Sequence, residues 1–207
     1  MLKKKAIHAV GWSAVEQVLL RLLAFGLTVI MARLLTPEDF GTVAMLGIFT
    51  SISVAFVDGG FSSALIQRQE VTQTDIATIF WYNLGMGATL TAAMFLAAPW
   101  IADFFHVEVL RPVARFLSFQ IVIGALSSVQ QSLLIKHLEF KKVLQVNVGS
   151  FFLSSCTGIV LAWYGFGLWA LVAQSLTASL ASTGLIWMLA SWRPTLEFSR
   201  ESFRSMF

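Results

Sequence analysis

Charge and cysteine are both scarce in this sequence of 207 residues. Charged residues make up 12% of it, whereas a typical soluble domain has about 25%. The single cysteine, Cys156, excludes an intramolecular disulfide and a metal site built from several cysteines. An HExxH motif, a glycine-rich nucleotide loop and a carboxylate pair at hydrolase spacing are also missing from the sequence. We therefore expect a protein that is not an enzyme and that binds no metal and no cofactor.

Apolar residues are abundant instead, at 57% of the sequence, and the mean hydropathy is +0.78. Five stretches of about 20 residues or more are nearly free of charge, and a sixth is interrupted only by Glu16, Gln17 and Arg21. A helix of about 20 apolar residues crosses the hydrocarbon core of a bilayer, where backbone groups must be bonded within the segment. We predict an all-α integral membrane protein with six transmembrane helices, at residues 7–32, 42–66, 77–101, 113–135, 143–163 and 168–187.

The sequence divides into a membrane domain and a short polar end. The six helices and their connections fill residues 1–192 and leave no room for a soluble catalytic domain. In residues 193–207, charged residues alternate with Phe198, Phe203 and Phe207, which is typical of a helix lying at the membrane interface. We interpret this segment as a cytoplasmic interfacial linker. The sequence stops within it without a natural end signal, as expected of a truncated chain.

The basic residues indicate how the helices are oriented. With the N-terminus in the cytoplasm, the cytoplasmic segments contain Lys3, Lys4, Lys5, Arg68, Lys136, Lys141, Lys142, Arg193, Arg200 and Arg204. The opposite face then has Arg33, Arg111 and Arg115. Because cytoplasmic loops are enriched in Lys and Arg, we expect both termini to be cytoplasmic. This distribution explains the net charge of +3 without a nucleic acid partner.

Polar residues of the first predicted span lie on one side of the helix. Ser13, Gln17, Arg21 and Thr28 cover an arc of about 80°, and Glu16 widens it to about 140°. A guanidinium inside a membrane costs at least about 2.5–3.5 kcal/mol on insertion scales, so it must face a partner or a water-filled cavity. Arg21 therefore either lines a cavity that binds an anionic substrate group or is neutralised by Glu16 or by a carboxylate of another helix.

The second predicted span contains Asp58 followed by Gly59 and Gly60, near its middle or slightly toward the cytoplasm. Two adjacent glycines weaken a helix, and interrupted helices in transporters mark places where the backbone faces a cavity. We interpret the pair as a helix break. Asp58 is a candidate for a proton or cation coupling site, or equally for the cap of the broken helix. A charge pair between Asp58 and Arg21 is the alternative, since consecutive helices joined by a tight turn are neighbours.

Amide side chains also occur inside the predicted spans. Gln120, Gln130, Gln131, Asn147 and Gln174 are typical of hydrogen bonds between helices rather than of ligand contacts. Small residues cluster at 149–158 and permit close approach of two helices. We expect both sets to hold the helices together.

Two longer motifs resemble a known family. Residues 31–41 read Met-Ala-Arg-Leu-Leu-Thr-Pro-Glu-Asp-Phe-Gly, and residues 57–68 read Val-Asp-Gly-Gly-Phe-Ser-Ser-Ala-Leu-Ile-Gln-Arg. Together they resemble the Wzx-type flippases and related PST exporters of the multidrug/oligosaccharidyl-lipid/polysaccharide superfamily. Members have 12 or more helices in two six-helix lobes around a central cavity. The resemblance therefore implies that this sequence is the N-terminal lobe of a two-lobe transporter.

The resemblance also implies a function. Such flippases move an undecaprenyl-diphosphate-linked oligosaccharide across the bacterial inner membrane for O-antigen, capsule or exopolysaccharide synthesis. We expect alternating access driven by an ion gradient, with Arg21 on the diphosphate and Glu16 and Asp58 in coupling. The expected partners are this lipid-linked substrate and membrane lipid, and among proteins a polysaccharide polymerase and a chain-length regulator.

Three other functions compete with this interpretation. A multidrug or cation antiporter of the same superfamily would favour an acidic cavity, whereas a flippase of lipid diphosphates needs cations. A membrane glycosyltransferase of polysaccharide assembly would present catalytic residues in a substantial outer loop, and the outer loops here are short. A non-transporting membrane component would have no need for the polar face of the first helix.

Overall fold

The computed structural model describes residues 18, 20–68, 71–197 and 199, and every regular element in that part of the chain is a helix. Residues 20–34 form the first described helix. The helices that follow are α2 (Pro37–Asp58), α3 (Phe61–Gln67), α4 (Gln73–Phe105), α5 (Leu110–Lys136), α6 (Phe140–Trp163) and α7 (Leu168–Leu189).

Among the described residues, five helices are long and apolar enough to cross a membrane, namely α2, α4, α5, α6 and α7. This confirms the prediction of an all-α membrane protein that crosses the bilayer several times. The first predicted span, 7–32, is described only at residue 18 and over 20–32. The second predicted span, 42–66, is in fact two helices, because α2 ends at Asp58 and α3 begins at Phe61.

Helices α2 and α4 both begin with a capping box. The hydroxyl of Thr36 accepts a hydrogen bond from the backbone N–H of Asp39, and the carboxylate of Asp39 accepts one from the N–H of Thr36 at 2.9 Å. Thr72 and Asp75 form the same reciprocal pair, at 3.0 Å for the Thr72 N–H. Each pair satisfies two backbone donors that would otherwise be unbonded. Both helices consequently begin four or five residues before the predicted spans, within the polar turns.

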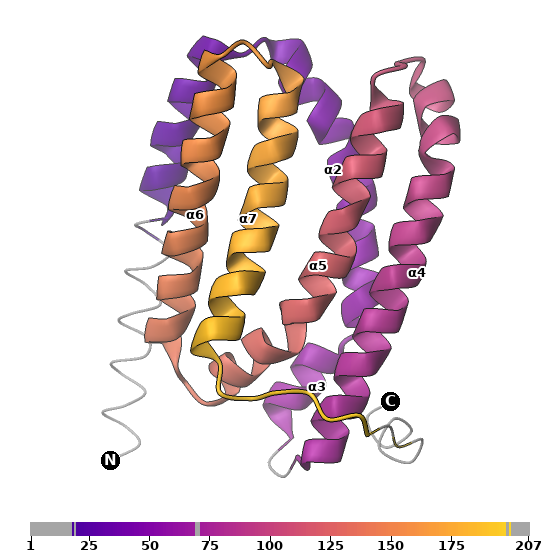
Figure 1. The fold of residues 1–207 in the computed structure, drawn as a ribbon, viewed down its shortest axis with the longest axis vertical. Helices are drawn as coiled ribbons and strands as arrows, with labels where there is room; N and C mark the ends of the chain where they lie inside the picture. Colours follow the sequence, from indigo (N-terminus) through magenta and orange to yellow (C-terminus); the bar gives the residue numbers. More distant parts are fainter. Residues whose placement is uncertain (1–17, 19, 69–70, 198, 200–207) are drawn as a thin grey trace.

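The long helices run up and down in one bundle (Figure 1). One layer contains α6, α7, α5 and α4 side by side in that order, and the helices next to each other in it are in contact. Behind this layer, α2 contacts α4, α5 and α7. The helix at 20–34 packs on α6 and α7, where Met31 and Leu35 are buried against Ala162 and Ala170.

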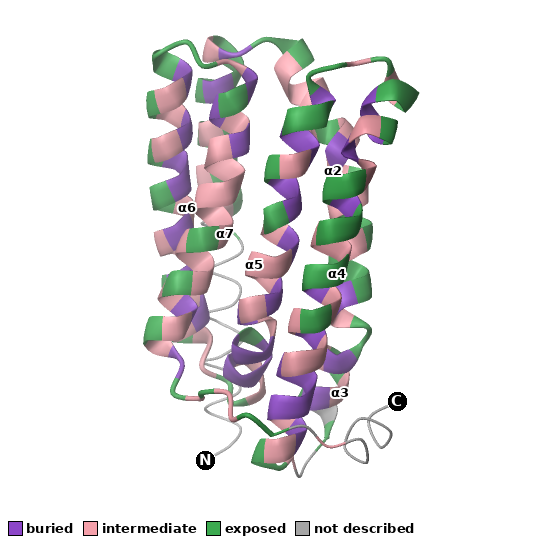
Figure 2. Cartoon of the chain, turned by 45° about the vertical axis from the view of Figure 1, so that its right-hand side comes forward, coloured by how far each residue is buried: buried purple, intermediate pink, exposed green. Residues whose placement is uncertain are grey.

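Large apolar side chains cover much of the outside of the bundle. Along α4, Leu96, Trp100 and Phe104 are 68%, 72% and 76% exposed, and exposed positions alternate with buried ones on this helix in Figure 2. An apolar surface of this extent is unusual in a soluble protein but is what lipid tails require of a transmembrane helix.

Close helix contacts depend on small residues, as in other membrane bundles. A Cβ atom added at Gly87 of α4 would lie 2.7 Å from the Cβ of Ala125 on α5. One added at Gly158 of α6 would lie 2.6 Å from Oε1 of Gln174 on α7. A larger residue at Gly87 would force α4 and α5 apart, because the Cβ of Ala125 is fixed to the backbone of α5, whereas at Gly158 the side chain of Gln174 would have to move first.

After α7 the chain continues without helix over residues 190–197 and crosses the end of the bundle to reach α4 (Figure 1). We call residues 190–197 and 199 the strap. Trp192 donates to Oε1 of Gln73 at 2.8 Å, Gln73 donates to the carbonyl of Arg193 at 3.1 Å, and Trp81 donates to the carbonyl of Thr195 at 2.9 Å. The expectation of an interfacial helix from residue 193 is therefore wrong for residues 193–197, which are not helical, and the carbonyls of Arg193 and Thr195 accept hydrogen bonds from α4 instead. Residues 198 and 200–207 lie outside the described part.

Candidate functional site

The break between α2 and α3 is made by two left-handed residues. Gly59 has a φ of 50° and Gly60 a φ of 83°, and residues other than glycine adopt such positive φ angles only with strain. The 22 residues of α2 already suffice to cross a membrane. Asp58 is therefore the last residue of a helix long enough to cross a membrane, nearer to its end than the expected place near the middle of a span or slightly toward the cytoplasm.

Asp58 is half-buried and connects the two helices across this break. Its Oδ1 accepts a hydrogen bond from the backbone N–H of Ser62 at 3.3 Å. This contact uses one lone pair of one carboxylate oxygen, so most of the acceptor capacity of Asp58 is left for other donors. Asp58 forms no salt bridge with any residue that the structure describes.

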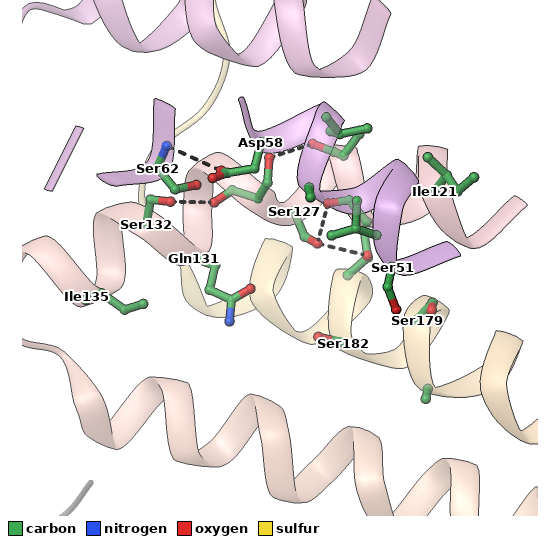
Figure 3. Close-up of a pocket in the computed structure, with 18 of the residues that line it drawn as sticks. Ser51, Asp58, Ser62, Ile121, Ser127, Gln131, Ser132, Ile135, Ser179 and Ser182 are labelled. Carbon is green, nitrogen blue, oxygen red and sulfur yellow. Dashed lines mark hydrogen bonds between the residues drawn. The ribbon is translucent and has the colours of Figure 1, made fainter. Parts of the chain in front are cut away.

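Asp58 borders an open cavity of about 810 Å³ lined by residues of α2, α3, α5 and α7, with one residue from α6 (Figure 3). We call it the Asp58 cavity. Its polar lining consists of Ser51, Asp58, Ser62, Ser127, Ser128, Gln131, Ser132, Ser150, Ser179, Ser182 and Thr183. Among the described residues that line it, Asp58 is the one with a formal charge, and it is negative.

The hydroxyls of this cavity act mainly as acceptors toward its interior. Most of them donate their proton to a backbone carbonyl one turn back or on a neighbouring helix, including Ser51, Ser127, Ser128, Ser132, Ser150 and Thr183. A hydroxyl that has donated its proton still has lone pairs to offer. Acceptor oxygens around a carboxylate favour a cation, a proton or a ligand rich in donors, and they disfavour a phosphate.

The described residues of the polar face of the first helix lie outside this cavity. Arg21 and Thr28 are exposed and do not line it. The hydroxyl of Thr28 donates to the carbonyl of Ala24 at 2.8 Å. Between Arg21 and Asp58, both of which are described, there is no ion pair. Ser13, Glu16 and Gln17 lie outside the described residues.

The predicted amide contacts divide into different environments. Gln120 donates to the hydroxyl of Ser175 on α7 at 2.7 Å, as expected of a bond between helices. Gln131 is exposed and lines the Asp58 cavity. Gln130 is fully buried, and neither atom of its amide has a partner in the described part of the chain.

Sequence reasoning missed the serines of the cavity. On α5, Ser128, Gln131, Ser132 and Ile135 all line the cavity, at the three- and four-residue spacing of one helix face. On α7, residues 179, 182 and 183 have the same spacing. This periodicity of polar residues within an apolar span was the available signal.

Comparison with known proteins gives a family and several relatives. A family model described as polysaccharide biosynthesis protein matches residues 30–207. The succinoglycan biosynthesis transport protein ExoT of Rhizobium meliloti is 27% identical over 196 residues, which are 95% of this chain and 40% of that protein. The lipopolysaccharide biosynthesis protein WzxC of Escherichia coli is 25% identical over 207 residues, covering 97% of this chain and 41% of that protein.

A third relative, the teichuronic acid biosynthesis protein TuaB of Bacillus subtilis, is 23% identical over 206 residues, covering 99% of this chain and 43% of that protein. The chain thus spans about two fifths of the length of these relatives. No solved structure matches the chain.

Proposed function

Because the chain belongs to the polysaccharide biosynthesis protein family, in agreement with the resemblance seen in its motifs, we propose that it forms one lobe of a flippase for lipid-linked oligosaccharides. The substrate is an oligosaccharide on undecaprenyl diphosphate, and the direction is from the cytoplasmic to the periplasmic leaflet of the bacterial inner membrane. The family match carries this proposal, and two of the relatives are named for transport or for lipopolysaccharide synthesis.

A flippase has to replace the water around the polar part of its substrate while that part crosses the membrane. A diphosphate and a chain of sugars cannot enter hydrocarbon without losing their hydrogen bonds to water, at a cost of several kcal/mol per polar group. A polar surface inside a membrane bundle replaces that water. For the sugars, the Asp58 cavity, with its serine oxygens between apolar helices, offers such a surface in the described part of the chain, whereas the diphosphate needs a basic group elsewhere.

We assign the charges of the substrate and of the driving ion to different places. The Asp58 cavity has one carboxylate and no basic residue among its described lining, so it suits a proton or a cation and repels diphosphate. Arg21 is exposed and forms no salt bridge with a described residue, which leaves its planar donors available to a phosphate. In this scheme Ser13, Gln17 and Thr28 support Arg21, and Asp58 couples transport to the ion gradient together with Glu16.

The remaining parts of the scheme follow from the bundle. A second lobe would complete the substrate path, and alternating access would then be a rocking of one lobe against the other. Arg68, Lys136 and Arg193 lie at the end of the bundle where α4 begins, which we place in the cytoplasm with both termini. A polysaccharide polymerase and a chain-length regulator are the proposed protein partners.

One observation favours a second candidate, a cation antiporter that exports drugs. The acceptor-rich lining of the Asp58 cavity would also suit an organic cation. The experiment that separates the two candidates is deletion of the gene in its host, with complementation by the intact gene. The flippase proposal expects loss of surface polysaccharide and unchanged sensitivity to cationic drugs. Normal surface polysaccharide with increased drug sensitivity would instead establish the antiporter.

A further inference from the structure

A second cavity, of about 380 Å³, lies at the end of the bundle where the strap crosses α5. We call it the end cavity. Its polar lining consists of Gln130 from α5, His137 and Glu139 from the turn before α6, and Ser191 from the strap. Trp192 and aliphatic side chains of α4 and α5 complete the walls. Its volume lies within the range of about 300–1,000 Å³ that is usual for small-molecule sites.

Gln130 is the residue that points to a ligand. It is 0% exposed, and both its Nε2 and its Oε1 are without a hydrogen-bond partner among the described residues. A buried amide without partners lowers the stability of the fold, because its hydrogen bonds to water are lost and no hydrogen bonds within the protein replace them. The burial changes across the cavity, since His137 and Ser191 are exposed while Gln130 is not. Both amide atoms of Gln130 are closed to solvent in this structure, so a ligand entering past His137 and Ser191 would reach this unsatisfied donor and acceptor once the side chains that cover them move apart.

The other groups restrict what this ligand can be. The indole N–H of Trp192 already donates to Gln73 at 2.8 Å, so Trp192 offers only its ring to the cavity. Glu139 is held at 2.8 Å from the ammonium of Lys142, so its charge is balanced at the mouth. No basic residue is among the described residues that line the cavity, apart from the imidazole of His137. Binding of an anion is therefore not favoured, and the inner wall of the cavity suits a neutral ligand.

A vicinal diol matches these requirements. One hydroxyl can donate to Oε1 of Gln130 while its neighbour accepts from Nε2, because the amide presents an acceptor and a donor side by side. The carbon skeleton of the same molecule would contact the aromatic and aliphatic walls. We propose that the end cavity binds one sugar ring of a neutral saccharide through two adjacent hydroxyls. The preference for a sugar over other neutral diols rests on the proposed function, in which an oligosaccharide is the cargo.

The test uses the full-length protein in lipid nanodiscs, labelled with 5-fluorotryptophan and observed by fluorine NMR. The resonance of Trp192 is assigned by its disappearance in Trp192→Phe. Methyl glycosides of glucose, galactose and mannose are the probes, and tetrahydropyran-2-methanol, a ring with no vicinal diol, is the control ligand. We expect a saturable shift of the Trp192 resonance with at least one glycoside and no shift with the control ligand.

Two variants of neighbouring glutamines complete the test. Gln130→Leu removes both amide hydrogen bonds at nearly the same volume and should weaken glycoside binding about tenfold or more. Gln131→Leu, whose side chain lines the Asp58 cavity instead, should leave the shift unchanged. If Gln130→Leu does not accumulate in the membrane, Gln130→Met replaces it.

The proposal is overturned if no glycoside shifts the resonance, or if the shift persists in Gln130→Leu. Absence of any shift together with a higher unfolding temperature of Gln130→Leu would show that the cavity holds only water. The proposed function fails independently, by normal surface polysaccharide after gene deletion, and glycoside binding at Gln130 would survive that result.

Discussion

The charge of Asp58 provides the most direct test of how transport is driven. Asp58→Asn keeps an oxygen that can accept from the N–H of Ser62, so the connection across the break between α2 and α3 is retained. The variant removes the only formal charge among the described residues that line the Asp58 cavity. We expect the free energy of unfolding to change by less than about 1 kcal/mol, which is the usual contribution of one neutral hydrogen bond.

The expected effect on ion binding is much larger. Two unit charges about 4 Å apart attract each other by about 1 kcal/mol in bulk water and by about 4 kcal/mol at the effective dielectric constant near a protein surface. Asp58 is half-buried, which places it between these limits. Loss of the carboxylate should therefore weaken binding of a monovalent cation by about 5-fold to 1,000-fold.

The assay is flipping of a lipid-linked oligosaccharide by the full-length protein in proteoliposomes, with and without an imposed ion gradient. Asp58→Asn should still bind the substrate but should lose the stimulation by the gradient. Asp103→Asn, at an exposed position near the opposite end of the bundle, is the matched control and should behave as the unmodified protein does. Gradient-driven flipping that is unchanged in Asp58→Asn over a range of pH would refute the coupling role.

Three further predictions concern the first helix, the orientation and the packing. Arg21→Ala should abolish surface polysaccharide while protein levels on immunoblots stay normal. Arg21→Lys should restore the polysaccharide only partly, because an ammonium lacks the planar paired donors of a guanidinium. Full polysaccharide export by Arg21→Ala would exclude a substrate role for Arg21. Reporter fusions after Trp192 should give a cytoplasmic signal and fusions within 106–110 an exported one, and the reverse result would invert the topology. Gly87→Val should lower stability by about 1–3 kcal/mol in thermal unfolding, because its Cβ would lie 2.7 Å from that of Ala125. The control Gly85→Ala has open space at the new Cβ and should not destabilise the protein, so equal losses in both variants would contradict this explanation.

The helices could be predicted from the sequence because hydrocarbon imposes one strong requirement, a long apolar segment. The four spans from 77–101 to 168–187 all fall within single helices of the structure. Their ends could not be predicted equally well, since α4 begins at Gln73 in a polar turn that the pair of Thr72 and Asp75 stabilises. Hydropathy locates the segment that crosses the membrane, whereas hydrogen bonds at the start of a helix extend the helix beyond that segment.

The candidate site was less predictable than the helices. Gly59 and Gly60 drew attention to Asp58 because adjacent glycines and an acid are rare inside an apolar segment. The serines facing Asp58 come from α5 and α7, and no local pattern states which faces of distant helices meet. Gln130 and Gln131 illustrate the same limit, since neighbours in sequence border different cavities once the helices pack.

The strap has a mechanical consequence. It leaves α7, yet it is fastened to α4 by Gln73, Thr74, Thr78 and Trp81, through side-chain hydrogen bonds of 2.8 to 3.1 Å. A pull on the chain beyond residue 199 would consequently be transmitted first to the start of α4 and only afterwards to α7. The strap thus ties α4 to the end of α7 by hydrogen bonds at this end of the bundle, whereas at the other end the α4–α5 and α6–α7 hairpins meet through apolar contacts such as that of Phe116 with Trp169.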